Sequence, residues 1–166
     1  RRERDSIVRF LNYPVRITYV GRLDKDSEGL LLMTNNGDII NRMMRAANKH
    51  EKEYKVTVDK PVTDEFLKEM AGGVPILDTV TRPCQVEKLG KYKFKIILTQ
   101  GLNRQIRRMC EALGYEVKEL RRVRIMNIEL GNLKPGEYRK VTDQELNELY
   151  ELIRDSKSEP TPWNNN

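Results

Sequence analysis

The chain has 166 residues, a length that suits one domain with its own hydrophobic core. Hydrophobic residues make up 38% and charged residues 34%, which excludes collagen-like, coiled-coil and low-complexity classes. The net charge of +6 indicates an anionic partner, whereas two cysteines and one histidine are too few for a disulfide framework or a four-ligand zinc site. The sequence also contains no apolar run of membrane-helix length, so we expect a reduced, cytoplasmic protein without metal or membrane partners.

The first third of the chain predicts short elements joined by polar loops. In order, they are a helix over 5–11, a strand over 15–20, a charged loop over 21–29, an apolar strand over 30–34 and a helix over 38–47. The strand over 30–34 has no polar face, so it should be buried on both sides. The helix over 38–47 should turn Ile39, Ile40, Met43 and Met44 toward the core.

The remaining pattern adds a strand over 52–58, with Tyr54, Val56 and Val58 on one face, and a helix that Thr63 caps and that ends near residues 72–73. A hairpin should follow, with strands over 80–89 and 92–99 around Gly90. The last predicted elements are a helix from Asn103 to Gly114, strands within 115–130 and a helix over 142–153 that opens on a capping box. Helices and strands that alternate without a βαβ rhythm favour an α+β fold with a mixed, mainly antiparallel sheet. Residues 155–166 are expected to form a disordered acidic tail.

The charge is unevenly distributed along the chain. Residues 1–25 and 101–124 each contain seven Lys or Arg against three Asp or Glu, and the C-terminal residues are acidic. If the two basic blocks fold onto one face, they form a nucleic-acid groove. The alternative interpretation is an ordinary solvated surface.

The loop over 21–29 holds five charged side chains and leads directly into the apolar strand. Such loops, anchored on a core strand, are frequent positions for functional sites. Three interpretations stand open: a plain charged turn, a calcium loop, or a catalytic carboxylate at Asp24 held by a neighbouring arginine. The calcium pattern fits Asp24, Asp26, Glu28 and Gly29, but Asn35 stands where a ligating glutamate is required.

The predicted helix after Asn103 begins with three arginines, Arg104, Arg107 and Arg108. Cations at a helix N-terminus oppose the helix dipole, so this arrangement favours a bound carboxylate or phosphate. A merely basic surface helix is the alternative. Tyr54 could likewise be a packing residue or an aromatic face on which a base stacks. No glycine-rich phosphate loop follows a strand, so the sequence indicates no nucleotide cofactor.

Together these segments resemble the RsuA/RluB/RluE/RluF-type pseudouridine synthase family, and most of all its RluF-type branch, which modifies large-subunit (23S) ribosomal RNA. The resemblance covers about residues 3–154. Its motifs are GRLDKDSEGL at 21–30, EKEY at 51–54, GVPI at 73–76, GLNRQIRRMC at 101–110 and RIMN at 124–127.

The resemblance implies the pseudouridine synthase catalytic fold over residues 1–154, without the family's N-terminal S4-like domain and first strand. It implies isomerisation of uridine by base flipping, with ribosomal RNA in a structured stem-loop as partner, no cofactor, and a monomer. Asp24 would be the essential carboxylate, Arg107 its ion-pair partner and Tyr54 the residue that stacks on the uracil. The RNA would be bound by Arg22, Lys25, Arg104, Ile106 and Arg108, with Ile106 closing the other side of the base.

Two questions stay open from the sequence. Asp24 could attack as a nucleophile or abstract a ribose proton. The chain could also be a non-catalytic RNA-binding or ribosome-assembly module. Binding alone requires the arginines, whereas a carboxylate among them reduces affinity for phosphates, so Asp24 distinguishes the two functions.

Overall fold

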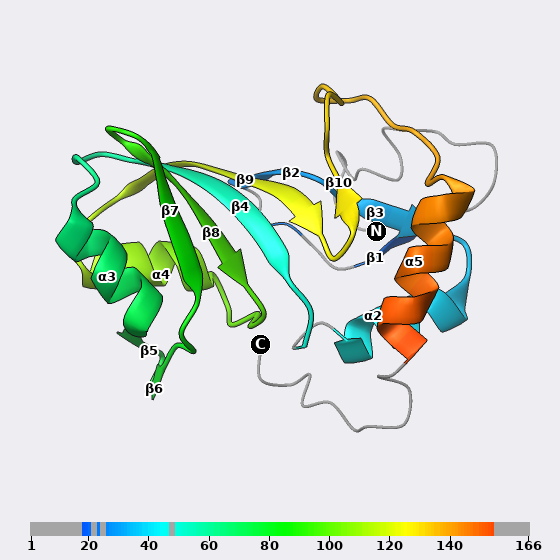
Figure 1. Cartoon of the computed structure of the whole chain (residues 1–166), viewed down its shortest axis with the longest axis horizontal. Coiled ribbons are helices and arrows are strands. Elements are labelled where there is room, and N and C mark those ends of the chain that lie inside the picture. Colours follow the sequence, from blue (N-terminus) through cyan, green and yellow to red (C-terminus); the bar gives the residue numbers. More distant parts are fainter. Residues whose placement is uncertain (1–17, 21–22, 24–25, 47–48, 155–166) are drawn as a thin grey trace.

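The structure is a computed structural model, and it describes residues 18–20, 23, 26–46 and 49–154. These residues form an α+β fold with a mixed, mainly antiparallel sheet and helices packed on it, which confirms the predicted fold class (Figure 1). The helix expected over 5–11 and the tail over 155–166 lie outside the described residues.

A six-stranded sheet spans the molecule. Its strands run in the order β10 (Ile128–Glu129), β9 (Val117–Ile125), β4 (Lys52–Val58), β8 (Lys93–Leu98) and β7 (Gln85–Gly90), all antiparallel to their neighbours. The sixth strand, β2 (Glu28–Gly29), pairs with β9 and is parallel to it. The predicted loop over 21–29 therefore ends in a short strand rather than at the apolar strand.

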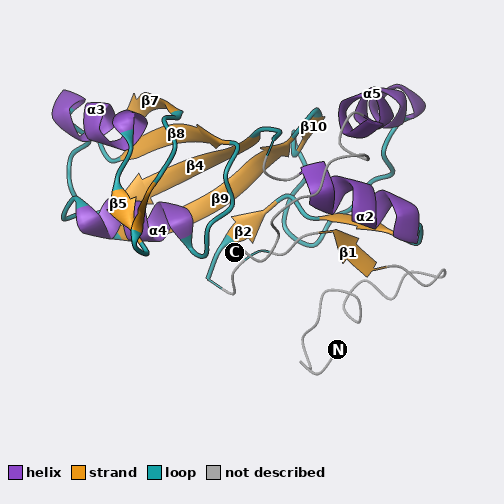
Figure 2. Ribbon diagram, turned by 90° about the horizontal axis from the view of Figure 1, so that it is seen from below, coloured by secondary structure: helices purple, strands orange, loops and turns teal. Residues whose placement is uncertain are grey.

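Two small antiparallel ribbons and four helices complete the described fold. The ribbons join β1 (Thr18–Val20) to β3 (Leu32–Thr34), and β5 (Pro75–Ile76) to β6 (Thr79–Val80). The helices are α2 (Gly37–Ala46), α3 (Asp64–Gly72), α4 (Gln105–Ala112) and α5 (Asp143–Arg154). In Figure 2, α4 lies below strands β8, β4 and β9.

Several local signals are confirmed. Strand β4 has the predicted bounds, and its Val56 and Val58 are buried. Thr63 caps α3 by accepting a hydrogen bond from the Phe66 amide at 3.0 Å. Thr142 and Glu145 form the predicted capping box, in which each side chain accepts a hydrogen bond from the other residue's amide, at 3.1 and 2.9 Å.

The apolar side chains gather in two clusters at opposite ends of the sheet. The larger cluster fills the space between the sheet and helices α3 and α4, around Phe94, Met70 and Met109. The smaller cluster joins α2 and α5 to the end of β9, around Met43, Ile125 and Ile153. Residues that lie between the two clusters are therefore held from both sides.

Three predictions about the strands and α2 are wrong. The strand over 30–34 is not buried on both faces, because β3 pairs only with β1 in a ribbon; Leu30 alone in this run is buried. Met44 is 41% exposed, since the buried stripe of α2 runs through Met43 and Ala46. The strand predicted over 80–89 begins at Gln85, because residues 79–80 turn back onto residues 75–76.

Gly29 is the position where a side chain would be least tolerated. Its φ is +120°, and an added Cβ would lie 2.3 Å from the Arg122 carbonyl oxygen. We expect Gly29→Ala to lower the free energy of unfolding in urea by about 1–3 kcal/mol. Gly37→Ala is the matched control, because no atom lies within 4 Å of its added Cβ. Equal effects of the two substitutions would contradict the close approach of β2 to β9.

Candidate active site

The loop before α4 is folded by side chains that the sequence pattern did not single out. The predicted cap at Asn103 is wrong: Arg104 occupies the N-cap position, with a left-handed backbone (φ 46°). The buried Gln105 side chain accepts a hydrogen bond from the Leu102 amide at 3.1 Å and so shapes the turn. Asn103 instead accepts two hydrogen bonds from the Arg108 guanidinium, at its backbone oxygen and at Oδ1. The helix ends at Ala112, two residues before the predicted Gly114.

The arginines at the start of α4 bind the segment that leads into β2. Arg104 donates two hydrogen bonds to the Asp26 carboxylate, at 3.2 and 3.1 Å. Arg107 donates to the Asp26 backbone oxygen at 2.7 Å and to Ser27 Oγ at 3.3 Å. A protein carboxylate thus offsets part of the repulsion between cations at this helix end.

The charge of Asp26 is stabilised by the same contacts. The hydrogen bond from Arg104 foremost, and then the charge of Arg107, lower the pKa of Asp26 below its usual value of 3.8. Arg107 itself is 11% exposed in its side chain, and its Nε is buried without a hydrogen-bond partner among the described residues. Its guanidinium is therefore held in one place.

Asp24 lies outside the described residues, as do Arg22 and Lys25. The predicted ion pair between Asp24 and Arg107 consequently stays a prediction. The structure places Arg107 against Asp26 and Ser27, two and three residues beyond Asp24 in the sequence.

Tyr54 and α4 lie on the same side of the sheet. Tyr54 is half-buried and packs against the larger core cluster, and Ile106 on α4 is 4% exposed within that cluster. The cross-strand partners of Tyr54 are Ile96 on β8 and Arg122 on β9. The contact of Tyr54 and Ile106 with a base stays a prediction.

Arg122 is one cation of a basic block in the sequence, but in the structure it is buried. Arg122 is 6% exposed and donates hydrogen bonds to the Leu30 carbonyl from Nε at 3.0 Å and from Nη2 at 2.8 Å. The Leu30 amide donates in return to the Arg122 carbonyl at 2.7 Å. The signal that could have found it is its spacing from the buried Leu120, two positions earlier on β9, because alternate residues of a strand share a face.

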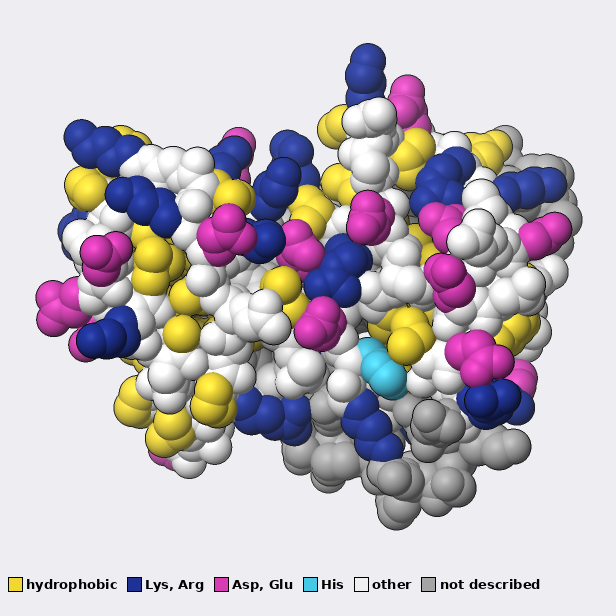
Figure 3. All heavy atoms as spheres, in the orientation of Figure 1, with side chains coloured by type: hydrophobic (Ala, Val, Ile, Leu, Met, Phe, Trp, Pro, Cys, Tyr) yellow, Lys and Arg dark blue, Asp and Glu magenta, His cyan; other side chains and the backbone are white. Residues whose placement is uncertain are grey.

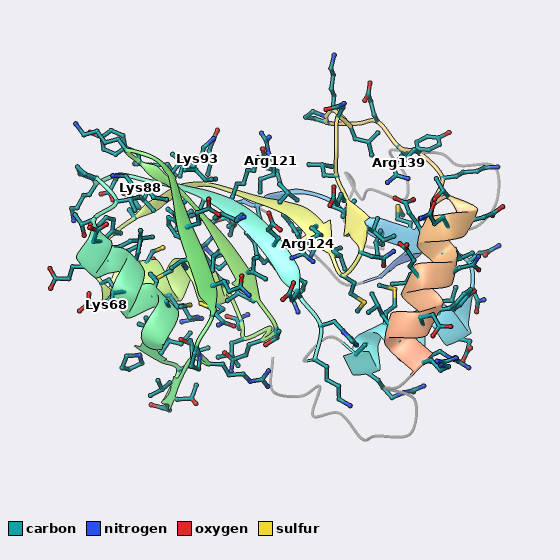
Figure 4. The ribbon with its side chains drawn as sticks, viewed as in Figure 1. Lys68, Lys88, Lys93, Arg121, Arg124 and Arg139 are labelled. Atoms are coloured by element: carbon teal, nitrogen blue, oxygen red, sulfur yellow. The ribbon has the colours of Figure 1, made fainter. Side chains whose placement is uncertain are left out.

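The residues of the motif over 51–54 make different contacts on the two faces of the sheet. Glu51 and Glu53 both accept hydrogen bonds from Arg124, at 2.9 and 3.0 Å. In Figure 4, Arg124 lies over the boundary between β4 and β9, and Arg121 projects outward from β9. Lys52 is half-buried beside Arg122 and Arg82, and desolvation foremost lowers its pKa to about 8. Lys52, two residues before Tyr54 in the sequence, therefore loses its charge at a lower pH than an ordinary lysine.

The sheet face that carries Arg124 is the one opposite α4, and its charges are mixed. Figure 3 shows basic and acidic side chains intermingled over this face, without a patch of one sign. The arginine helix and the segment that it binds lie on the other side of the sheet (Figure 2).

Within the described part of the chain, no helix has the length and apolar character needed to cross a membrane.

Comparisons with known proteins agree with the predicted family. The family model for RNA pseudouridylate synthases matches residues 2–112. The chain is 58% identical over 160 residues to the dual-specificity RNA pseudouridine synthase RluF of Escherichia coli strain K12, covering 96% of this chain. It is 35% identical over 146 residues to the ribosomal small subunit pseudouridine synthase A of Yersinia pestis, covering 85% of this chain and 62% of that protein.

A solved structure gives the same result. The crystal structure of a pseudouridylate synthase superposes with a TM-score of 0.80 at 33% identity, covering 87% of this chain and 65% of that one. The present chain spans 55% of the length of the RluF protein.

The titration of Asp26 tests this geometry. We expect its pKa, measured by carbon-13 NMR of the carboxyl group, to lie below 3.8, and Arg104→Met to raise it more than Arg107→Met does. The interaction contributes stability above pH 3.8 that is lost as pH falls through the lowered pKa. Asp59 is the internal control, because a hydrogen bond from the Glu116 amide, not an arginine, chiefly lowers its pKa. If the pKa of Asp26 were unchanged in Arg104→Met, the ion pair between these two residues would be contradicted.

Proposed function

Because the chain belongs to the RNA pseudouridylate synthase family, we propose that it isomerises uridine to pseudouridine in large-subunit (23S) ribosomal RNA. The observation that carries this proposal is the convergence of three motifs on one side of the sheet. The arginine helix α4 binds residues 26–27 directly, and Tyr54 lies on the adjoining strand β4. Its relatives at 58% identity are named dual-specificity enzymes, so the assay includes a second RNA class beside 23S ribosomal RNA.

The reaction rearranges one nucleotide without adding or removing atoms. The N1–C1′ bond of uridine breaks, the uracil turns, and a C5–C1′ bond forms while the C5 proton leaves and N1 gains one. To reach C1′, the enzyme must take the base out of its stack. We assign Tyr54 to stack on the extruded uracil, its hydroxyl to assist removal of the C5 proton, and Ile106 to close the opposite side.

Asp24 supplies the carboxylate that acts at the ribose. Such a carboxylate must stay ionised in a site from which water is excluded, and a guanidinium nearby provides this. Arg107 is suited to the role because it is nearly buried and is already bound to the Asp24-bearing segment at Asp26 and Ser27. Arg107 therefore both aims the segment and stabilises its charge.

The RNA backbone is bound by Arg22, Lys25, Arg104 and Arg108. Arg108 lies close to the helix start, where it donates to Asn103, and Arg104 shares its guanidinium with Asp26. Residues 1–154 constitute the catalytic domain, which acts as a monomer in the cytoplasm on a structured stem-loop. Both described cysteines, Cys84 and Cys110, are free thiols, which suits a reducing compartment.

The essential carboxylate can be identified by comparing two neighbouring aspartates. We expect Asp24→Asn to abolish pseudouridine formation, measured as tritium release from C5-labelled uridine in 23S ribosomal RNA, and to leave RNA binding nearly intact. The control Asp26→Asn removes the ion pairs with Arg104 and Arg107 but should retain measurable turnover. Near wild-type turnover in Asp24→Asn would contradict the assignment. A wild-type chain that binds RNA without forming pseudouridine would support the non-catalytic RNA-binding module instead.

RNA affinity should depend on salt because it rests on phosphate contacts. With about 4–6 contacts, the slope of log affinity against log salt should be about −3 to −5. Arg108→Ala should flatten the slope by about one unit, because one contact releases its counterion. Tyr54→Ala should lower turnover and leave the slope unchanged, because stacking releases no counterion. Filter binding across a salt series gives both slopes, and equal slopes for the two variants would contradict the groove.

A further inference from the structure

The segment over 26–30 is held at two points, and only one of them belongs to the predicted motifs. At Asp26 it is bound by Arg104 and Arg107 on α4. At Leu30 it is bound by Arg122 on β9, a residue that no motif over 21–30, 51–54 or 101–110 contains. The second point lies six residues beyond Asp24.

We propose that Arg122 is a positioning residue of this site: its buried guanidinium fixes residues 26–30, which follow Asp24 in the sequence, against β9, the strand that pairs with β4 at Tyr54. This inference rests on the proposed pseudouridine synthase function. It assigns Arg122 no contact with the reacting atoms.

The bonds between Arg122 and Leu30 are reciprocal. The guanidinium donates twice to the Leu30 carbonyl, at 3.0 and 2.8 Å, and the Leu30 amide donates to the Arg122 carbonyl at 2.7 Å. Between them, Gly29 lies so close to the Arg122 backbone that only a glycine fits. The segment therefore has a single register against β9.

A bulge in β9 directs Arg122 toward the site. Glu53 pairs with Arg124 and Tyr54 pairs with Arg122, so Val123 is an extra residue in β9. In a regular strand Arg122 and Arg124 would share a face, but the bulge separates them. Arg124 binds Glu51 and Glu53 on one face of the sheet, and Arg122 lies beside Tyr54 on the other. The cross-strand partner of Tyr54 is thus the same residue that anchors Leu30.

This chemistry favours a positioning role over a purely stabilising one. A buried guanidinium is costly to desolvate, and well-packed apolar side chains often replace buried ion pairs without loss of stability. A methionine of similar length would fill the space but could not donate to the Leu30 carbonyl. Arg122→Met therefore removes the anchor and keeps much of the packing.

The test compares three variants of the full chain in single-turnover assays at saturating 23S ribosomal RNA. We expect Arg122→Met to lower the rate about 100-fold with an unchanged Kd for RNA, because misplacing a reacting group by about 1 Å has that effect. Arg122→Lys should recover part of the loss, since an ammonium can donate one of the two bonds. Leu120→Val is the matched control: Leu120 is buried on the same strand, in contact with the core rather than with Leu30. Its thermal midpoint should fall, while its rate below that midpoint should stay near wild type.

The outcomes separate the inference from the function on which it rests. A wild-type rate in Arg122→Met overturns the inference alone. So does an equal loss of rate in Leu120→Val at the same folded fraction, because the effect would then be general destabilisation. A wild-type chain that forms no pseudouridine in any RNA overturns the proposed function, and with it the positioning role.

Discussion

The hydrogen bonds between the Arg122 guanidinium and the Leu30 carbonyl join parts of the chain that are 92 residues apart in sequence. Strand β2 has only two residues, too few to hold its place by backbone pairing alone, yet it is the connection between the charged loop and the central sheet. Arg122 and the close approach at Gly29 supply the rest of the attachment. Because β9 also pairs with β4, this contact helps to set where residues 26–30 lie relative to Tyr54.

The other end of the attached segment is bound by helix α4. Residues 26–27 extend toward α4, where Arg104 and Arg107 bind them, and α4 packs into the larger core cluster through Ile106 and Met109. Leu30 belongs to the smaller cluster with Ile125 and Met126. The segment therefore bridges two cores, each of which fixes one of its ends. Charge is balanced locally, since a loop carboxylate is placed where the helix dipole and neighbouring arginines would otherwise repel one another. Such an arrangement keeps a polar loop in place without burying it.

Features fixed by neighbours in sequence were predictable. Strand β4, the Thr63 cap and the Thr142–Glu145 capping box each follow from a few adjacent residues, and the structure confirms them. The arginines of the motif over 101–110 were also identified, although Asn103 does not cap their helix. What could not be predicted depends on contacts across the sheet. Period-two alternation gives no sign of the bulge at Val123, so it cannot assign Arg122 and Arg124 to different faces of the sheet. The parallel pairing of β2 likewise needs β9, far along the chain, before it can form.

The proposed function places RNA on the α4 side of the sheet, between the segment over 21–30 and Tyr54. A crystal structure of the chain with a stem-loop of 23S ribosomal RNA tests this most directly. We expect one uridine turned out of the stem, with its base against Tyr54 and its ribose beside Asp24, while phosphates approach Arg104 and Arg108. RNA bound on the opposite face, over Arg124 and its glutamates, with every base still stacked, would contradict it.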